Sequence, residues 1–332
     1  MSDNLSTSLK TRKILLSGVK PTGKPHIGNY FGAMKRFVEL QDVYESYIFI
    51  ADLHAITTVQ NREELVNNTI NVVLDYLAIG LDPKKVCIYK QSDVPQVTEL
   101  AWIFNCLTTV PYLMRAHAYK DAVANGKEPN VGLFDYPLLM AADILIQDAD
   151  VVPVGQDQKQ HVEIARDTAE KFNRIFGPAK DGASETFKLP EPLILEDVAT
   201  VPGLDGRKMS KSYGNTISLF ATDDDIEKVV MNIVTDSSGE HPENVYAIHA
   251  LLKDKELLDN LYKENKGKYK ILKEMLIDDL QDFIRPIREK RQKLEKDKDT
   301  VLEVLREGGR VARERVEKKM EIVRDKVGLK LS

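Results

Sequence analysis

Four short apolar runs alternate with longer segments of helical period in the first half of the chain. Each run has the length of a strand and is rich in β-branched residues. The runs are KILLSG (13–18), SYIFIAD (46–52), KVCIYK (85–90) and ADVVPVG (149–155). Strands that alternate with helices form parallel sheets through right-handed crossovers. We therefore expect an α/β fold, with a Rossmann-like parallel sheet that carries helices on both faces.

One helix between these strands is marked at both ends. Asn61 followed by Glu64 is a typical helix start, and Gly80 with Pro83 beyond it is a typical end. Ligands of open parallel sheets bind outside the carboxyl ends of the strands. A functional site is therefore expected where the predicted strands end.

The pattern changes near Thr222. Thr222 with Asp225 opens another helix, and helical segments follow it without a convincing strand. The last 32 residues hold nine Lys and Arg against six Asp and Glu, which is either a solvated helix face or a local basic surface. The expected parts are a flexible tail (1–12), a Rossmann-like domain (13–216), an all-α C-terminal domain (217–300) and a C-terminal helix (301–332).

Composition excludes several classes of protein. A chain of 332 residues that is 42% hydrophobic can bury a sizeable core, and no run approaches the roughly 20 apolar residues of a membrane span. The net charge of −5 argues against a general nucleic-acid coat but permits a local basic face. Cys87 and Cys106 are too few for a disulfide framework and are expected to be buried thiols in a reducing cytoplasm.

The stretch SGVKPTGKPHIGN (17–29) leaves the first predicted strand and enters a helix near His26. Glycines at 18, 23 and 28 allow close approach of backbone to a ligand, and the start of a helix attracts an anion. The spacing is neither the G-x-G-x-x-G fingerprint nor a P-loop. By itself this stretch is either a phosphate-binding loop or an ordinary strand-to-helix turn.

A second glycine-flanked stretch, GLDGRKMSKSYGN (203–215), places Lys208 and Lys211 on one short loop with Ser210 and Ser212. Two ammonium groups on a loop can follow negative charge as it builds on a polyphosphate. Together the two loops point to phosphoryl or nucleotidyl chemistry.

The two loops also resemble a known pair. His26-Ile-Gly-Asn29 is similar to the HIGH signature, and Lys208-Met-Ser-Lys-Ser212 to the KMSKS signature, of class I aminoacyl-tRNA synthetases. The stretch at 140–167, with DLHAIT at 52–57, resembles the bacterial tryptophanyl-tRNA synthetases from about residue 13 to the C-terminus. Asn29 stands where the tyrosine enzymes usually carry a second histidine.

The resemblance implies roles for particular residues. His26, Asn29, Lys208 and Lys211 are the implied catalytic residues. The implied ATP-binding residues are Lys20, Gly28, Asn29, Gly155, Asp157, Lys208, Met209, Ser210 and Lys211. The implied tryptophan-binding residues are His54, Tyr136, Met140, Asp143 and Gln158.

Asp143 stands alone in an apolar helical run, LLMAADILI. The indole N–H of tryptophan is a donor without acceptor capacity, so one fixed carboxylate in an apolar pocket selects for it. Without the family, a hydrogen-bonded structural Asp is the simpler interpretation. Tyr136 and Met140 share the face of Asp143, and both are also consistent with ordinary core residues.

The implied reaction joins tryptophan to the α-phosphate of ATP, expels pyrophosphate and passes tryptophan to the terminal ribose of tRNA(Trp), with Mg²⁺ carried on ATP. No residues with metal-ligand spacing are found, since His117, His161, His241 and His249 are scattered. The family implies a cytoplasmic homodimer. It also implies that 217–300 reads the anticodon, and that helix 301–332 either packs back on the catalytic domain or lies near the tRNA.

Lys20 departs from the family, where a glutamine usually follows the small apolar residue. Either the ammonium faces the reacting groups or it is a solvent-pointing lysine. Two other functions stay open from the sequence, a tyrosine-specific sister enzyme and a catalytically idle RNA-binding paralogue.

Overall fold

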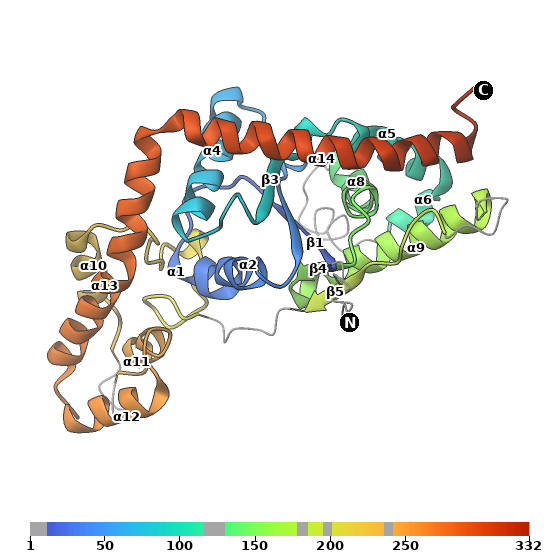
Figure 1. Cartoon of the computed structure of the whole chain (residues 1–332). Coiled ribbons are helices and arrows are strands. Elements are labelled where there is room, and N and C mark those ends of the chain that lie inside the picture. The colour runs from blue at the N-terminus through green and yellow to red at the C-terminus, as the bar shows by residue number, and fades with distance from the viewer. Residues whose placement is uncertain (1–11, 116–129, 178–184, 195–200, 236–241, 332) are drawn as a thin grey trace, which may run out of the picture.

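The computed structural model describes residues 12–115, 130–177, 185–194, 201–235 and 242–331. Its centre is a parallel sheet of five strands in that part of the chain, in the order β3-β2-β1-β4-β5 (Figure 1). The strands are β1 (Ile14–Val19), β2 (Glu45–Ile50), β3 (Val86–Lys90), β4 (Val151–Val154) and β5 (Glu191–Ile194).

The predicted α/β fold is confirmed, and so are its four strands, with ends shifted by one to two residues. The fifth strand, β5, was not predicted from the sequence. It is four residues long and contains Pro192, which normally argues against a strand. Pro192 is tolerated because β5 is the edge strand and pairs only with β4 in the described sheet.

Helices of the first part of the chain flank this sheet. They are α1 (Ile27–Asn29), the π-helix η1 (Tyr30–Met34), α2 (Lys35–Leu40), α3 (Asp52–Ala55), α4 (Arg62–Ala78), η2 (Gln91–Asp93), α5 (Gln96–Leu107), α6 (Val110–Leu113), α8 (Val131–Ile146), η3 (Gln156–Gln158), α9 (Lys159–Phe176) and η4 (Lys211–Tyr213). The predicted start of α4 is confirmed, because the Asn61 side chain accepts a hydrogen bond from the Glu64 N–H.

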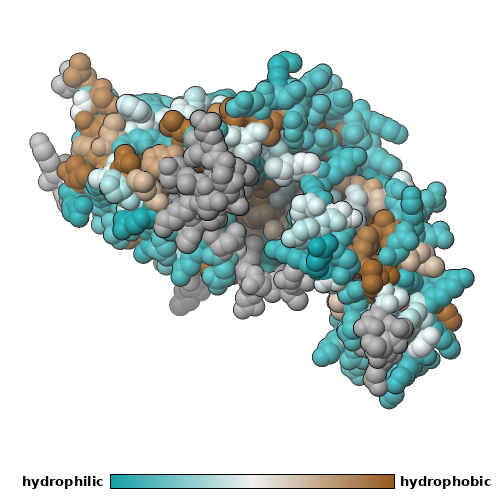
Figure 2. Space-filling view, turned by 180° about the vertical axis from the view of Figure 1, so that it is seen from behind, coloured by the Kyte–Doolittle hydropathy of each residue, from teal (hydrophilic) through white to brown (hydrophobic). Residues whose placement is uncertain are grey.

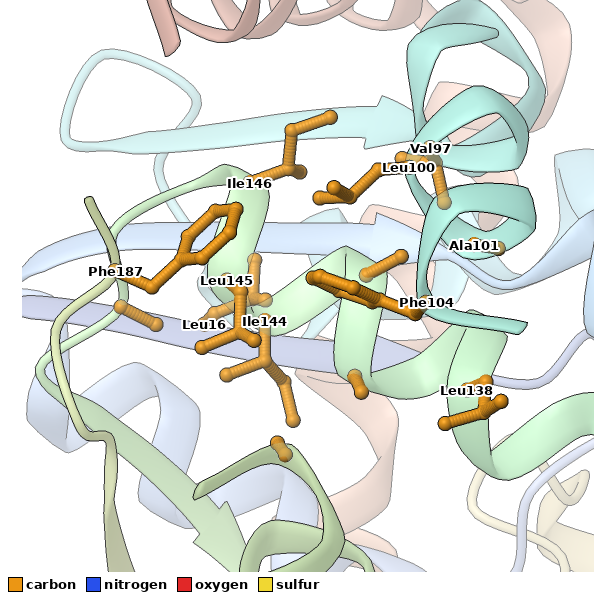
Figure 3. Close-up of a cluster of buried hydrophobic side chains, with 14 of the residues drawn as sticks. Leu16, Val97, Leu100, Ala101, Phe104, Leu138, Ile144, Leu145, Ile146 and Phe187 are labelled. Carbon is orange, nitrogen blue, oxygen red and sulfur yellow. The ribbon is translucent and has the colours of Figure 1, made fainter. Parts of the chain in front are cut away.

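Alternate residues of the central strands enter two different cores. In β2, Tyr47 and Phe49 face a core formed with α5, α8 and α9, whereas Ile48 and Ile50 face a core that includes α4. Figure 3 shows part of the first core, where Phe187, Ile144 and Leu145 lie near Leu16 of β1. This alternation is what a sheet covered on both faces requires.

The remaining helices are α10 (Asp223–Met231), α11 (Glu243–His249), α12 (Lys255–Glu264), α13 (Tyr269–Lys296) and α14 (Lys298–Val327). The helix predicted from Thr222 is confirmed, with Thr222 and Asp225 forming a reciprocal cap. The first four helices form an arm beside the sheet, and α14 then runs back across the molecule (Figure 1). The core that includes α4 continues into α10 and α13 without a break.

The long helix α14 lies directly on β3. A β-carbon at Gly308 would come within 1.9 Å of the Ile88 carbonyl oxygen, so only glycine permits this approach. The Cys87 thiol donates to the Gly308 carbonyl oxygen at 3.3 Å and is partly buried. Cys106 was expected to be buried but is exposed, because it lies on the outer side of α5.

Within the described residues no helix combines the length and apolar character that a membrane crossing needs. Of the tail predicted for residues 1–12, only Arg12 belongs to the residues that the structure describes.

Candidate active site

The carboxyl ends of β1 and β4 border a cavity of about 890 Å³. Val19 and Lys20 line it from the end of β1, and Gly155 lines it directly after β4. This is where the strand order reverses, the usual ligand position on an open parallel sheet. The cavity brings together the predicted catalytic residue His26 and most of the residues implied for ATP, namely Lys20, Gly28, Asn29, Gly155, Lys208, Met209, Ser210 and Lys211.

His26 and Asn29 hold each other at the start of α1. The backbone N–H of His26 donates to Asn29 Oδ1 at 3.0 Å, and the backbone N–H of Asn29 donates to His26 Nδ1 at 3.3 Å. A β-carbon at Gly28 would come within 2.9 Å of His26 Nδ1. The imidazole is therefore held in one orientation, and the residue under it has to be glycine.

The His26 imidazole is neutral at physiological pH. Burial, assisted by the nearby positive charge of Lys211, lowers the pKa of His26 to about 4. Since Nδ1 accepts a hydrogen bond from Asn29, the neutral ring carries its proton on Nε2. The ring is thus a hydrogen-bond donor at Nε2 whose state does not change near neutral pH.

Asn215 organises the lysine loop, although the sequence analysis did not single it out. Its Nδ2 donates to Asp205 Oδ1 at 2.7 Å and to the Lys208 carbonyl oxygen at 3.2 Å, and its Oδ1 accepts from the Ser210 N–H at 2.8 Å. A β-carbon at Gly203 would lie 2.2 Å from Asn215 Nδ2. The backbone of the loop is therefore tightly held by one buried amide.

The lysine side chains differ from the backbone that carries them. Lys208 and Lys211 are exposed, whereas Met209 between them is buried in the core and its N–H donates to the Val201 carbonyl at 2.9 Å. Burial of part of its chain lowers the pKa of Lys211, and the negative charge of Asp75 opposes this. Partial burial also lowers the pKa of Lys20.

Backbone hydrogen bonds join the two loops to each other. The Ile27 N–H donates to the Ile217 carbonyl at 3.0 Å, and the Leu219 N–H donates to the Pro25 carbonyl at 3.1 Å. His26 and Ser218 form an antiparallel bridge between these two bonds. The segment that leaves the lysine loop is thus paired with the first loop by backbone hydrogen bonds.

Asp75 of α4 is the one carboxylate among the described residues that line the cavity. Its side chain is buried, and Arg291 Nε of α13 donates to Asp75 Oδ1 at 2.6 Å. Burial raises the pKa of Asp75 to about 6, and the hydrogen bond from Arg291 opposes the rise. No sequence motif pointed to this residue.

A second polar group surrounds Asp143, which is only 3% exposed. His54 Nε2 lies 3.0 Å from Asp143 Oδ2, and Gln91 Nε2 donates to both carboxylate oxygens at 2.9 and 3.0 Å. The backbone N–H of His54 donates to Gln91 Oε1 at 3.2 Å. Burial raises the pKa of Asp143, while the His54 and Gln91 hydrogen bonds oppose the rise.

The other residues implied for tryptophan lie on the same elements. The Tyr136 hydroxyl is 2.5 Å from His161 Nε2, and its ring meets the His54 ring edge-on at 6.2 Å. Met140 is partly buried against the core of α5 and α8. Gln158 is exposed in η3, and Asp157 beside it has a side chain outside the described structure.

Gln91 and His161 were not predicted as site residues from the sequence, for different reasons. Gln91 directly follows β3, so the rule that ligands bind where strands end would have found it. His161 has no metal-ligand spacing in the sequence. Its contact with Tyr136 depends on how α8 packs against α9. Within the described residues, no group of three or more His, Cys, Asp or Glu is placed to hold a metal ion.

Known proteins resemble this chain over nearly its whole length. Residues 8–296 match the family described as tRNA synthetases class I (W and Y). A tryptophan-tRNA ligase from Fusobacterium nucleatum is 52% identical over 321 residues, which cover 93% of this chain and 97% of the relative. A tryptophan-tRNA ligase from Rhodopirellula baltica is 45% identical, over 90% of this chain and 94% of the relative.

Solved structures agree with these sequence matches. Tryptophanyl-tRNA synthetase from Campylobacter jejuni, complexed with ADP and tryptophan, superposes with a TM-score of 0.87 at 40% identity and covers 95% of this chain and 99% of that one. Tyrosyl-tRNA synthetase from Archaeoglobus fulgidus gives a TM-score of 0.61 at 20% identity, with 85% and 91% covered, a likeness of fold alone. The chain therefore belongs to the class I tRNA synthetases for tryptophan and tyrosine, in the bacterial tryptophan branch.

Proposed function

We propose that this chain is a tryptophan-tRNA ligase that forms tryptophanyl-adenylate from L-tryptophan and ATP and then transfers tryptophan to the 3′-terminal ribose of tRNA(Trp). The observation that carries the proposal is the single cavity that holds both signature loops at the reversal point of the sheet. ADP and tryptophan are bound in the Campylobacter jejuni relative, which covers 95% of this chain.

In the proposed first step, the tryptophan carboxylate attacks the α-phosphate of ATP and pyrophosphate leaves. His26 Nε2–H and the Asn29 amide donate to phosphate oxygens from fixed positions at the start of α1. Lys208 and Lys211 follow the negative charge onto the leaving pyrophosphate. Asp75, the carboxylate in the described lining, is already paired with Arg291, and Mg²⁺ is proposed to enter with the substrate ATP.

Asp143 is the proposed acceptor for the indole N–H. His54 and Gln91 hold the carboxylate from one side, leaving the acceptor capacity of an ionised carboxylate for a further donor. A substrate without a donor at that point leaves a buried charge incompletely paired, which is the basis for rejecting it. Tyr136, Met140 and Gln158 are proposed to complete the tryptophan site.

We assign residues 13–216 to catalysis and 217–300, the arm of α10 to α13, to recognition of the anticodon. The assignment is supported by the distance of the arm from the sheet and by exposed lysines such as Lys263 and Lys268 on it. Residues 301–332 include α14, which packs against β3 and α5. Contacts with tRNA phosphates make binding sensitive to salt.

The proposed active form is a homodimer in the cytoplasm. Large apolar side chains are exposed on α5 and at the start of α8, with Trp102 70% and Val131 80% exposed, and Trp102 lines a groove of about 500 Å³ together with Ile56 and Leu139. Seen from behind, most of the surface is hydrophilic, and brown, hydrophobic surface lies at the end of the molecule away from the arm and in a patch on the arm (Figure 2). A second copy of the chain is the partner proposed for this face.

The test is ATP-pyrophosphate exchange with each amino acid in turn, followed by charging of purified tRNAs. Exchange that depends on tryptophan, with charging of tRNA(Trp), is the expected result. Exchange with tyrosine instead would identify the sister specificity. Binding of tRNA without any exchange would identify a catalytically idle paralogue and overturn the proposal.

A further inference from the structure

We propose that Asp75 is a positioning residue for adenylate formation, a role that rests on the proposed function. Its buried carboxylate, anchored by Arg291 of α13, attracts the Lys211 ammonium and keeps it at the wall of the nucleotide cavity until the triphosphate engages it.

The anchoring of Asp75 is unusually complete. Asp75 is 2% exposed and Arg291 is 6% exposed. Arg291 donates from Nε to Asp75 Oδ1 at 2.6 Å and from a terminal nitrogen to Asn71 Oδ1 at 2.8 Å, and its guanidinium lies 4.9 Å from the centre of the Phe220 ring. A carboxylate held in this way has a fixed position, and the hydrogen bond from Arg291 favours its ionised form.

Positively charged side chains outnumber negatively charged ones in the described lining of the cavity. Lys20, Lys208 and Lys211 line the cavity, and Asp75 is the one acid among the described residues of the lining. The Lys211 ammonium lies against the first loop, where a β-carbon at Gly23 would be 3.3 Å from Nζ. Before ATP arrives the lysines repel one another, and the charge of Asp75 offsets this repulsion at Lys211 and also acts on Lys24 of the first loop.

The anchor also connects the cavity to the helical arm. Arg285, Arg288 and Arg291 follow one another at intervals of three residues along α13, so they share one side of the helix. Arg288 donates to the Ala221 carbonyl at 2.5 Å and pairs with Asp223, just beyond the segment that is hydrogen-bonded to the first loop. A single helix, α13, thus contacts both Asp75 and the residues that follow the paired segment.

Two opposite effects of the Asp75 charge on the reaction follow. The negative charge repels the triphosphate in the ground state, which weakens ATP binding. It also keeps Lys211 in place for the transition state, which speeds the chemical step. Removing the charge while keeping the shape therefore strengthens ATP binding and slows adenylate formation at the same time.

The test compares Asp75→Asn with Asp223→Asn, a control that pairs with Arg285 and Arg288 of the same helix, α13, and does not line the cavity. For Asp75→Asn we expect the KM for ATP in tryptophan-dependent pyrophosphate exchange to fall about threefold and kcat to fall about tenfold. Asp223→Asn should leave both within twofold. A merely structural role would lower the active fraction, and therefore kcat, with the KM for ATP unchanged.

Arg291→Gln provides a second test of the role of Asp75. Without its partner the buried Asp75 takes up a proton, so the same split between KM and kcat is expected, and the double variant Asp75→Asn/Arg291→Gln should be no slower than the slower single variant. Effects that multiply in the double variant, or an Asp75→Asn enzyme with an unchanged KM for ATP, would overturn the proposal.

Calorimetric titration with a non-hydrolysable ATP analogue separates this proposal from the proposed function. Tighter binding of the analogue by Asp75→Asn than by the wild-type chain is expected whether or not turnover is observed. Equal affinities would overturn the role of Asp75 alone. A wild-type chain without tryptophan-dependent exchange would instead overturn the proposed function.

Discussion

A histidine that serves a phosphate site must keep its proton where the substrate needs it. His26 achieves this through burial and the neighbouring Lys211 charge, which together lower its pKa to about 4. The hydrogen bond from the Asn29 N–H to Nδ1 then places the remaining proton on Nε2. An exposed histidine would titrate near pH 6.5 and change its charge in the physiological range.

The lowered pKa of His26 predicts a dependence of stability on pH. As the pH falls below about 6.5, the unfolded chain binds a proton that folded His26 refuses until about pH 4. The contribution of His26 is therefore complete above pH 6.5 and is lost as the pH falls, by ~2 kcal/mol between pH 7.5 and pH 5. Urea unfolding of the wild-type chain and His26→Asn at both pH values measures this difference. Equal losses in the two proteins would show that His26 is not responsible.

Asp143 allows a second prediction at the scale of one residue. Asp143→Ala should lower kcat/KM for tryptophan about 10²-fold or more, because a charge-assisted hydrogen bond in a dry pocket is lost. Asp143→Asn keeps the shape and one acceptor, so its kcat/KM for tryptophan should lie between those of the wild-type chain and Asp143→Ala. Pyrophosphate exchange at saturating ATP gives these values, and the KM for ATP serves as the internal control. An unchanged kcat/KM in Asp143→Ala would exclude Asp143 as the indole acceptor.

At the scale of elements, the docking of α14 on β3 depends on a missing side chain. Gly308 brings the helix backbone against the Ile88 carbonyl, and the Cys87 thiol adds a hydrogen bond at the same point. Elsewhere α14 is held by buried apolar side chains such as Val316 and Met320, and at its edge by the paired hydrogen bonds from Arg324 to Glu99 of α5 at 2.7 and 2.8 Å. The central contact is therefore steric and tolerates no added atom.

Gly308→Ala should destabilise the fold by about 3 kcal/mol or more, since the new β-carbon would lie 1.9 Å from the Ile88 oxygen and the helix has to move. Gly309→Ala, whose β-carbon would lie 3.0 Å from Asp93, should cost less. Gly32→Ala meets no atom within 4 Å and serves as the matched control. Thermal unfolding of the three variants ranks them. A Gly308→Ala protein as stable as Gly32→Ala would contradict the close contact.

At the scale of the whole molecule, the apolar face around Trp102 predicts the oligomeric state. Trp102→Glu places a charge on that face and should convert a dimer into a monomer of 37.5 kDa. Leu257→Glu, at a site 63% exposed on α12 of the arm, should leave the dimer intact. Light scattering coupled to size exclusion distinguishes the two masses. A Trp102→Glu protein that elutes as a dimer would show that the chains meet elsewhere.

The sequence alone determined the features that depend on local pattern. Four strands, the α4 and α10 caps and the two glycine-punctuated loops were predicted correctly, because hydrophobic period, capping residues and glycine spacing act over a few residues. The motif pair also identified the family, which the comparisons confirm. The strand β5 and the exposed Cys106 were missed, because edge position and helix orientation are set by distant neighbours.

Only the tertiary structure decided which residues distant in sequence share a charge or a hydrogen bond. Gln91 meets Asp143 because η2 and α8 both pack against α3, and Arg291 reaches Asp75 because α13 packs against α4. Asn215 acquires its role only when the lysine loop folds around it. Each contact joins elements whose placement depends on how the hydrophobic faces of the whole chain are buried, and no local pattern in the sequence encodes that arrangement.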